Sequence, residues 1–403
     1  MRNPLEGLNV LGLLYAGVGP MTCQILGEYG ANVIRIESLA RPDNLRVSAP
    51  FQGGKVDINR SGAFTWFNND RNSLALNMKH PRAKEVTVRL AKWADVIVEN
   101  FTPGVVNSWG LGYEAVKALN PDIIMVSLSQ VGQTGPKRSL PGYGPQLQGF
   151  AGFDYITGWP DRPPVLVARS YPDFVGPRFG AIAVMAALDY RRRTGKGQYI
   201  DCSEYEDCLH FLAPIFLDYS ANKHITVRHG NRSETNCPHN VYRCQGEDRW
   251  CAVDVTTEEE WAAFCQAIGQ VALAKDNRFK DLASRKKNEE YLDKIIEAWT
   301  SQHTAEDVMQ ILQKVGIAAG TVRTPKEIAS CPQLKHRHYF WTLKHQEMGD
   351  IVNPGQSSIL SKSPYELKKA APCLGADTEH VCKDLLGLTE EEYVSLLLDR
   401  IFE

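Results

Sequence analysis

The stretch LNVLGLLYAGVGPMTCQILGEYGANVIRIE, residues 8–37, contains the pattern that decides the fold. Residues 8–14 form an apolar run that is typical of a buried strand, and residues 32–37 predict a second strand. Between them, Gly19-Pro20 and Gly30 mark the expected start and end of a helix. A strand, a helix and a strand in this order predict a parallel β-α-β unit.

The same alternation of strands and helices continues along the first half of the chain. It predicts an α/β fold built around a doubly wound parallel sheet. The expected helices span Pro81–Trp93, Tyr113–Leu119 and Pro177–Arg193, and the expected strands span Asp95–Glu99, Asp122–Ser127 and Tyr199–Cys202. Residues 130–172 are rich in Gly, Pro and aromatic residues, and so long an irregular stretch usually carries function.

The pattern changes after about residue 225, which predicts a second domain. Two short strands are expected within residues 241–255, and helices follow at residues 258–268, 288–301 and 304–315. We therefore expect residues 1–225 to form the N-terminal part of the large domain and residues 226–330 to form a smaller α+β domain. Residues 331–403 are expected to form a linker that returns to the large domain and includes a helix at 389–399.

Charge and hydropathy exclude several classes of partner. The 403 residues carry a net charge of -2, so no broad basic surface is available for nucleic acid or for an anionic membrane. No apolar run approaches the length of a membrane-spanning helix, and the N-terminus lacks the apolar region of a signal peptide. Ten cysteines without a C-x-x-C pair favour a cytoplasmic protein without a metal site.

Gly17-Val18-Gly19 lies between a predicted strand and a predicted helix, and Glu37 ends the next strand. This spacing resembles a dinucleotide-binding fingerprint. However, Thr22 occupies the third glycine position, and Pro20 lacks an N–H group that would face a phosphate. A tight turn is therefore favoured over nicotinamide binding, and no tightly bound cofactor is expected.

Asp173 lies three residues before Gly176-Pro177, at the start of a long apolar helix. Spacing alone leaves two interpretations open. Asp173 is either a helix-entry residue that contacts backbone donors or a nucleophile whose anionic form is favoured by the helix N-terminus.

Several basic residues lie in loops of the first half of the chain, and Arg71, in NNDRNS, is one of them. Each residue alone is typical of a solvated surface charge, but together they are predicted to hold phosphate groups. The others are Arg41, Arg46, Lys137 and Arg138.

A set of segments in a fixed order carries a family resemblance over nearly the full chain. The chain resembles the family III CoA-transferases, which include formyl-CoA:oxalate, crotonobetainyl-CoA:carnitine and benzylsuccinate CoA-transferases. The matching segments are PLEGLNVL, GPMTCQILGEYGANVIRIE, DRNSLALN, ADVIVENFTPG, GLGYEAVKALNPDIIMVSLS, TGKGQYIDCSEYE and GNRSETNCPHNVYRCQGEDRW. Any one of them is a weak signal, but their order and spacing together are specific.

The resemblance implies an enzyme that moves CoA from an acyl-CoA thioester to a free carboxylic acid through an aspartyl anhydride and an aspartyl-CoA thioester. It identifies Asp173, in ARSYPDFVGPRFG, with the catalytic aspartate. CoA enters as part of the substrate, and the residues expected near it are Val18, Gly19, Arg41, Arg71, Asn100, Phe101, Pro103 and Lys137. It also implies a Rossmann-like large domain, a small domain and an interlocked dimer, either of identical chains or with a related subunit.

Two alternatives remain within the same fold. A 2-methylacyl-CoA racemase needs two acid–base groups, but the segment that carries its histidine corresponds here to residues 141–144, which contain none. A non-catalytic subunit of a heteromeric transferase is the other alternative, and the presence of Asp173 argues against it. The resemblance does not identify the acyl group, because the loop that covers the active site in the oxalate enzyme corresponds to a different sequence at residues 234–239.

Overall fold

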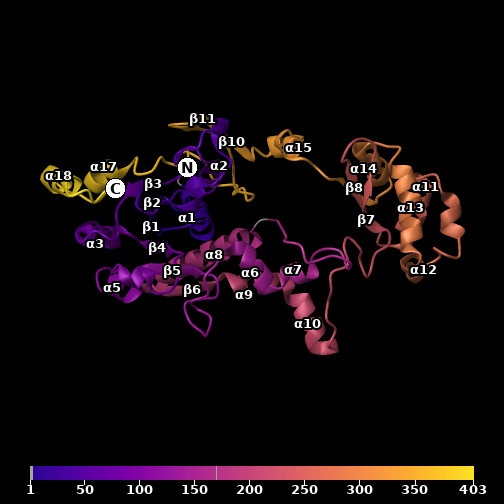
Figure 1. The fold of residues 1–403 in the computed structure, drawn as a ribbon, viewed down its shortest axis with the longest axis horizontal. Helices are drawn as coiled ribbons and strands as arrows, with labels where there is room; N and C mark the ends of the chain where they lie inside the picture. The colour runs from indigo at the N-terminus through magenta and orange to yellow at the C-terminus, as the bar shows by residue number, and fades with distance from the viewer. Residues whose placement is uncertain (1–2, 169) are drawn as a thin grey trace. The chain divides into compact units, whose positions relative to one another are not determined.

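The computed structural model describes residues 3–168 and 170–403. The chain divides into two compact units (Figure 1). The first comprises residues 3–155, Val165–Thr226 and Lys335–Glu403, and the second comprises Ile156–Pro164 and Val227–Leu334. The second unit thus includes the short segment Ile156–Pro164. The sequence alone did not separate this segment from the first domain.

The first unit is built around a six-stranded parallel sheet with the strand order β3-β2-β1-β4-β5-β6. This result confirms the predicted α/β fold. The strand order reverses between β1 and β4, and loops at such a point open a crevice at the carboxyl ends of the strands. The strands are β1 (Asn9–Leu13), β2 (Asn32–Glu37), β3 (Asn72–Ala75), β4 (Val96–Glu99), β5 (Ile124–Ser129) and β6 (Tyr199–Ser203).

Helices cover both faces of this sheet because successive strand residues point to opposite sides. Val10 and Val98 pack with α1 (Val18–Glu28) and α8 (Tyr171–Thr194) in one apolar cluster. Leu11 and Ile97 pack in another cluster with α3 (Ala83–Trp93) and α18 (Glu390–Leu398).

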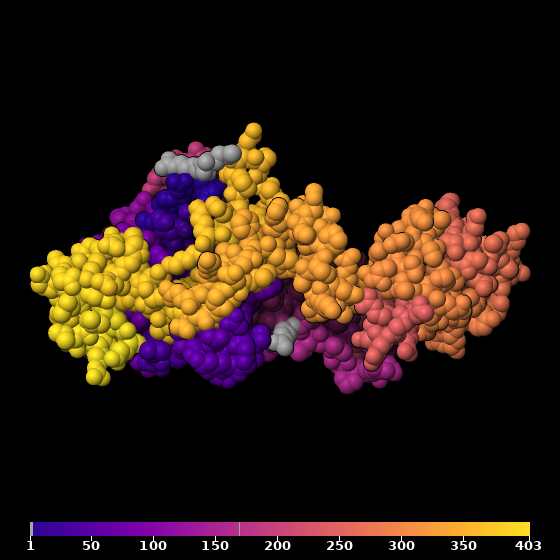
Figure 2. Space-filling model, turned by 90° about the horizontal axis from the view of Figure 1, so that it is seen from above, coloured from indigo at the N-terminus to yellow at the C-terminus, as the bar shows by residue number. Residues whose placement is uncertain are grey.

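The C-terminal segment packs against the N-terminal part of the first unit. The backbone N–H of Asn77 donates to the carbonyl of Ile401 at 2.8 Å, and Asp70 accepts hydrogen bonds from the N–H groups of Lys368 and Lys369. Figure 2 shows the C-terminal residues, in yellow, against the indigo N-terminal residues. Strands β10 (Phe340–His345) and β11 (Gly349–Pro354) form a hairpin in the same segment.

The second unit is an antiparallel sheet with a layer of helices. Its strands are β7 (His239–Arg243), β8 (Trp250–Asp254) and β9 (Ala318–Thr321). The evenly spaced Cys237, Cys244 and Cys251 are buried in its apolar core. Its principal helices are α11 (Glu258–Ala267), α12 (Leu282–Lys287), α13 (Glu289–Thr300) and α14 (Ala305–Lys314).

Most expected helices and strands are confirmed to within a few residues, but α8 begins earlier than expected. It starts at Tyr171, so Pro177 lies inside the helix and Asp173 lies in its first turn. A proline there lacks the N–H that would bond to the carbonyl of Asp173. The remaining helices are α2 (Gly62–Phe67), α4 (Val105–Ser108), α5 (Tyr113–Lys117), α6 (Gly144–Ala151), α7 (Phe153–Ile156), α9 (Glu204–Leu209), α10 (Ala213–Asn222), α15 (Pro325–Ala329), α16 (Pro332–His336) and α17 (Thr378–His380).

The described residues contain no helix that is long and apolar enough to cross a membrane.

Candidate active site

The loops that follow β1 and β4 meet where the strand order reverses. The side-chain oxygen of Asn100 accepts a hydrogen bond from the N–H of Tyr15 at 2.9 Å, and its amide nitrogen donates to the carbonyl of Tyr15 at 2.6 Å. Gly19 lies directly beneath this pair, because a Cβ at that position would overlap the Asn100 amide. The second glycine of the Gly17-Val18-Gly19 turn therefore permits close packing, as the tight-turn interpretation predicted.

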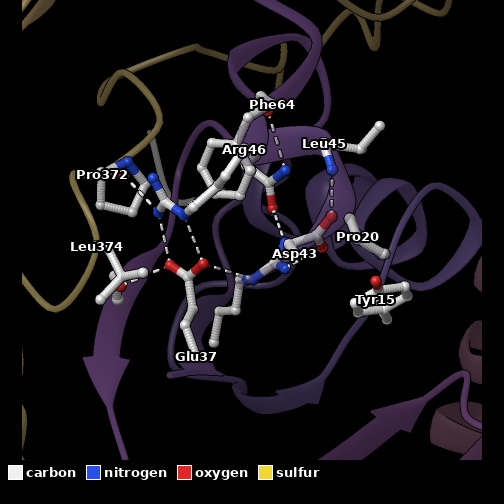
Figure 3. Close-up of polar contacts among 12 residues, drawn as sticks. Tyr15, Pro20, Glu37, Asp43, Leu45, Arg46, Phe64, Pro372 and Leu374 are labelled. Atoms are coloured by element: carbon white, nitrogen blue, oxygen red, sulfur yellow. Dashed lines mark hydrogen bonds and ion pairs between the residues drawn. The ribbon is translucent and has the colours of Figure 1, made fainter. Parts of the chain in front are cut away.

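A buried ionic network joins β2 to the segment that follows it, and one of its residues, Asp43, also contacts the loop after β1 (Figure 3). Arg46 donates to both oxygens of Glu37, at 2.6 and 2.7 Å, and Arg35 forms an ion pair with Asp43. Asp43 also accepts from the N–H of Ala16 at 3.1 Å, which helps hold Ala16 at a φ of 58°.

Glu37 is committed to this network. Burial alone would raise the pKa of its carboxyl, but Arg35 and Arg46 hold that pKa down at about 2. Both oxygens of Glu37 accept from Arg46, and one also accepts from the Ser73 hydroxyl at 2.7 Å. Glu37, the acidic residue of the incomplete dinucleotide fingerprint, therefore has protein hydrogen-bond partners on both carboxylate oxygens.

Asp173 faces the loop after β1 from the first turn of α8. A Cβ at Gly17 would lie 3.1 Å from both Cβ and Oδ2 of Asp173. A Cβ at Gly144, the first residue of α6, would overlap the Ser170 hydroxyl and lie 2.5 Å from Asp173 Oδ1. Two glycines from different elements thus leave space around one carboxylate.

Burial raises the pKa of Asp173, and the Ser170 hydroxyl, which donates to Oδ2 at 2.6 Å, lowers it in part. Loss of solvation outweighs the favourable hydrogen bond, so the pKa of Asp173 lies above its ordinary value. A less solvated carboxylate is a better nucleophile than one in open solvent.

Asp173 lines a cavity of about 330 Å³ at the carboxyl ends of the sheet strands, beside the Tyr15–Asn100 pair. A second cavity, of about 150 Å³, shares Tyr15, Arg41 and Phe101 with the first. A third, of about 670 Å³, shares Thr102, Pro103 and Arg138 with the first. Neighbouring cavities at this place in a parallel sheet are typical of a site that binds a long substrate.

Comparison with known proteins identifies the family of the chain. A family model described as CoA-transferase family III matches residues 5–378 of the chain. The chain belongs to CoA-transferase family III.

Relatives of this CoA-transferase match it over almost its full length. The succinyl-CoA–D-citramalate CoA-transferase of Chloroflexus aurantiacus is 32% identical, over 99% of this chain and 98% of its own length. The acetyl-CoA:oxalate CoA-transferase of Acetobacter aceti is 31% identical, over 93% of each chain. A solved structure of a CaiB/BaiF family protein from Brucella suis has a TM-score of 0.87 and 28% identity, over 96% of this chain and 100% of its own.

The structure brings most of the predicted site residues of this CoA-transferase together. Among the predicted residues, those that line the cavity beside Asp173 are Val18, Arg41, Asn100, Phe101 and Pro103. Lys137 is not among the lining residues; its ammonium lies 5.6 Å from the ring centroid of Phe150, while the next residue, Arg138, does line the cavity.

Arg71 is not brought to these cavities. Its side chain is 2% exposed, and its guanidinium donates to the carbonyls of Pro20 at 2.8 Å and Phe67 at 3.0 Å. Burial lowers the pKa of Arg71 to about 10. The contacts describe a residue that ties the start of α1 to the segment before β3. Its assignment to the CoA phosphates stays a prediction.

Sequence reasoning missed several residues that line the cavities of this CoA-transferase. Glu204 follows β6 in the segment SEYE and lines the Asp173 cavity, although the residue is only 4% exposed. Lys79 lines the second cavity together with Arg41. Both residues follow the carboxyl end of a sheet strand. Polar residues at these ends could therefore have been predicted from the sequence as candidates to line the site.

Proposed function

We propose that this CoA-transferase moves CoA from an acyl-CoA thioester to a free carboxylic acid, with Asp173 as nucleophile. One observation carries the proposal: Asp173 is a partly desolvated carboxylate in the cavity at the reversal of strand order. Gly17 and Gly144 leave room for a reacting carbonyl beside it.

The chemistry proceeds through Asp173 in two exchanges. A carboxylate oxygen of Asp173 attacks the thioester carbonyl, the C–S bond breaks, and a mixed anhydride and CoA thiolate form. The thiolate attacks the aspartyl carbonyl, the anhydride C–O bond breaks, and the donor acid leaves as a carboxylate. The acceptor carboxylate then reverses both steps, which yields the new acyl-CoA and free Asp173. Backbone N–H groups around residues 17–19 stabilise the oxyanions in this scheme.

The second cavity suits the nucleotide end of CoA. Arg41 and Lys79 supply positive charge at its wall, and Arg41 also lines the Asp173 cavity. Phe101 and Trp109, whose rings meet edge to face at 5.0 Å between centroids, supply aromatic surface for a base. We assign the phosphates to these two cations and the thioester end to Asp173.

Arg41→Ala and Arg71→Ala form a matched pair that tests this assignment. We expect Arg41→Ala to raise the KM for acyl-CoA by about tenfold, leave the KM for the free acid unchanged, and keep the free energy of unfolding, because Arg41 is exposed. We expect Arg71→Ala to lower the free energy of unfolding by about 2 kcal/mol, because it removes two hydrogen bonds from a buried side chain to backbone carbonyls. Steady-state kinetics and urea unfolding measure both. A tenfold KM effect from Arg71→Ala at unchanged stability would instead favour Arg71 as the phosphate ligand.

The acyl groups are inferred from the relatives. Their names include succinyl-CoA as donor and D-citramalate or glutarate as acceptor. We therefore propose a short dicarboxylic acid as at least one substrate. The purified chain, assayed with succinyl-CoA and acetyl-CoA against a panel of mono- and dicarboxylic acids, should form a new acyl-CoA with at least one dicarboxylate. Failure with every acid, alone and with candidate partner chains, would contradict the proposal.

We also propose an obligate oligomer, as a homodimer or with a related subunit, in a reducing cytoplasm. Two relatives from Chloroflexus aurantiacus are named as the alpha and beta subunits of one succinyl-CoA–L-malate CoA-transferase. The ten cysteines are all buried and free, which suits a reducing compartment. Light scattering of the purified chain at low concentration should give at least twice the 45.0 kDa of one chain, and an active monomer would contradict the proposal.

A further inference from the structure

Glu204 is a buried carboxyl that the chemistry above does not use. It begins α9, directly after β6, and lines the same cavity as Asp173. A Cβ at Gly176, which lies on α8 beyond Asp173, would come within 3.1 Å of Glu204 Cγ and 3.2 Å of the Val18 side chain. The absence of a side chain at Gly176 thus makes room for Glu204 next to the nucleophile's helix.

The carboxyl of Glu204 makes no hydrogen bond to any other residue that the structure describes. Its side chain is 4% exposed. A polar group that has no protein partner and lines a cavity can be met there by water or by a ligand. Because Glu204 lines the cavity, the partner that the geometry permits is a molecule bound beside Asp173.

The groups around Glu204 favour its neutral form. Burial raises the pKa of Glu204 well above its ordinary value, and the nearby carboxylates of Asp173 and Asp207 raise it further. The thiols of Cys202 and Cys208 also lie near Glu204, and the cations that line the same cavity are Arg41 and Arg138. A neutral carboxylic acid has an O–H donor, which an ionised carboxylate lacks.

We propose that Glu204 binds the carboxylate of the free acid, donating a hydrogen bond from its own neutral carboxyl while the acid attacks or leaves Asp173. A free acid must enter a cavity that already contains an aspartate, so a second negative charge would repel it, whereas a neutral donor attracts it. The proton stays on Glu204 throughout, and no bond to Glu204 forms or breaks. The inference rests on the proposed function, since it concerns the acid that exchanges at Asp173.

Glu204→Leu and Glu204→Gln test whether Glu204 acts as a hydrogen-bond donor or only fills space. Leucine removes the donor, so we expect the KM for the free acid to rise at least tenfold while the KM for acyl-CoA changes less than threefold. Glutamine keeps a neutral donor, so both constants should stay within threefold of the parent. Glu206→Gln is the matched control, because Glu206 lies on the same helix with an exposed side chain. Unchanged acid KM in Glu204→Leu, or equal damage to both substrates in both variants, would overturn the proposal.

The pH dependence gives a second test that needs only Glu204→Gln to fold. In the parent enzyme, the KM for the free acid should rise as alkaline pH ionises Glu204, and in Glu204→Gln it should stay flat over the same range. A flat profile in the parent would overturn the proposal. Asp173→Asn, assayed alongside, keeps the two hypotheses distinct: if it transfers CoA, the nucleophile assignment fails, whatever the Glu204 variants do.

Discussion

Asp173→Asn is expected to reduce CoA transfer by a factor of roughly 10³ or more, because an amide cannot form the anhydride that the reaction passes through. Asparagine has almost the same shape as aspartate, so contacts with Gly17, Gly144 and Ser170 remain possible. The KM for acyl-CoA of any residual activity, or CoA binding measured by calorimetry, should stay within a few-fold of the parent value.

Folding provides the control for this variant. Burial raises the pKa of Asp173 in the native chain, which means that folding disfavours its charge. A carboxyl whose pKa is raised in the native state makes folding less favourable as pH rises through its ordinary pKa. Asparagine is neutral at every pH, so at pH 7 it should leave the midpoint of urea unfolding unchanged or slightly higher. Near-normal transfer in a fresh sample, with deamidation excluded by mass, would contradict the role of Asp173.

Gly144→Ala is expected to lower transfer by about 100-fold, because a methyl group there overlaps the Ser170 hydroxyl and lies 2.5 Å from Asp173 Oδ1. The nucleophile and the hydroxyl that donates to it would both have to move, and a displacement of about 1 Å at a reacting group can cost that much. Overpacking of this kind also destabilises a fold by about 1–3 kcal/mol. The measurement is kcat/KM together with urea unfolding.

Gly320→Ala is the control for this substitution. Gly320 lies in β9, and a Cβ there meets no atom within 4 Å, so both activity and stability should stay near the parent values. Full activity in Gly144→Ala would show that the space beside Asp173 is wider than these contacts indicate.

Local sequence patterns predicted the elements of the fold well where a strand or helix is long and apolar. Residues 32–37 were predicted as a strand and form β2 with the same limits, because every residue after Asn32 in that strand is buried. Strand β3 is only four residues long, which gives too little alternation to be recognised. The early start of α8 was missed because Pro177 resembled a first-turn proline, although Pro172 occupies that position.

The site was harder to predict because burial, which sequence does not show, decides what a charged side chain does. Arg71 and Arg41 both looked like loop cations. Arg71 is enclosed by backbone carbonyls, whereas Arg41 is exposed at the edge of two cavities. Glu204 attracted no notice in an acidic segment that is typical of a helix start, yet the packing of α9 against α8 brings it to the nucleophile's cavity.

The most direct test of covalent catalysis by Asp173 is the mass of the peptide that contains YPDFVGPR. It is measured after the enzyme is incubated with donor acyl-CoA and no acceptor. Hydroxylamine should convert the activated Asp173 to a hydroxamate, and borohydride should reduce its thioester to an alcohol. We expect both mass changes at Asp173 in the parent enzyme and neither in Asp173→Asn. Efficient transfer by the parent enzyme, with no modification at Asp173 under either reagent, would contradict the covalent role of this aspartate.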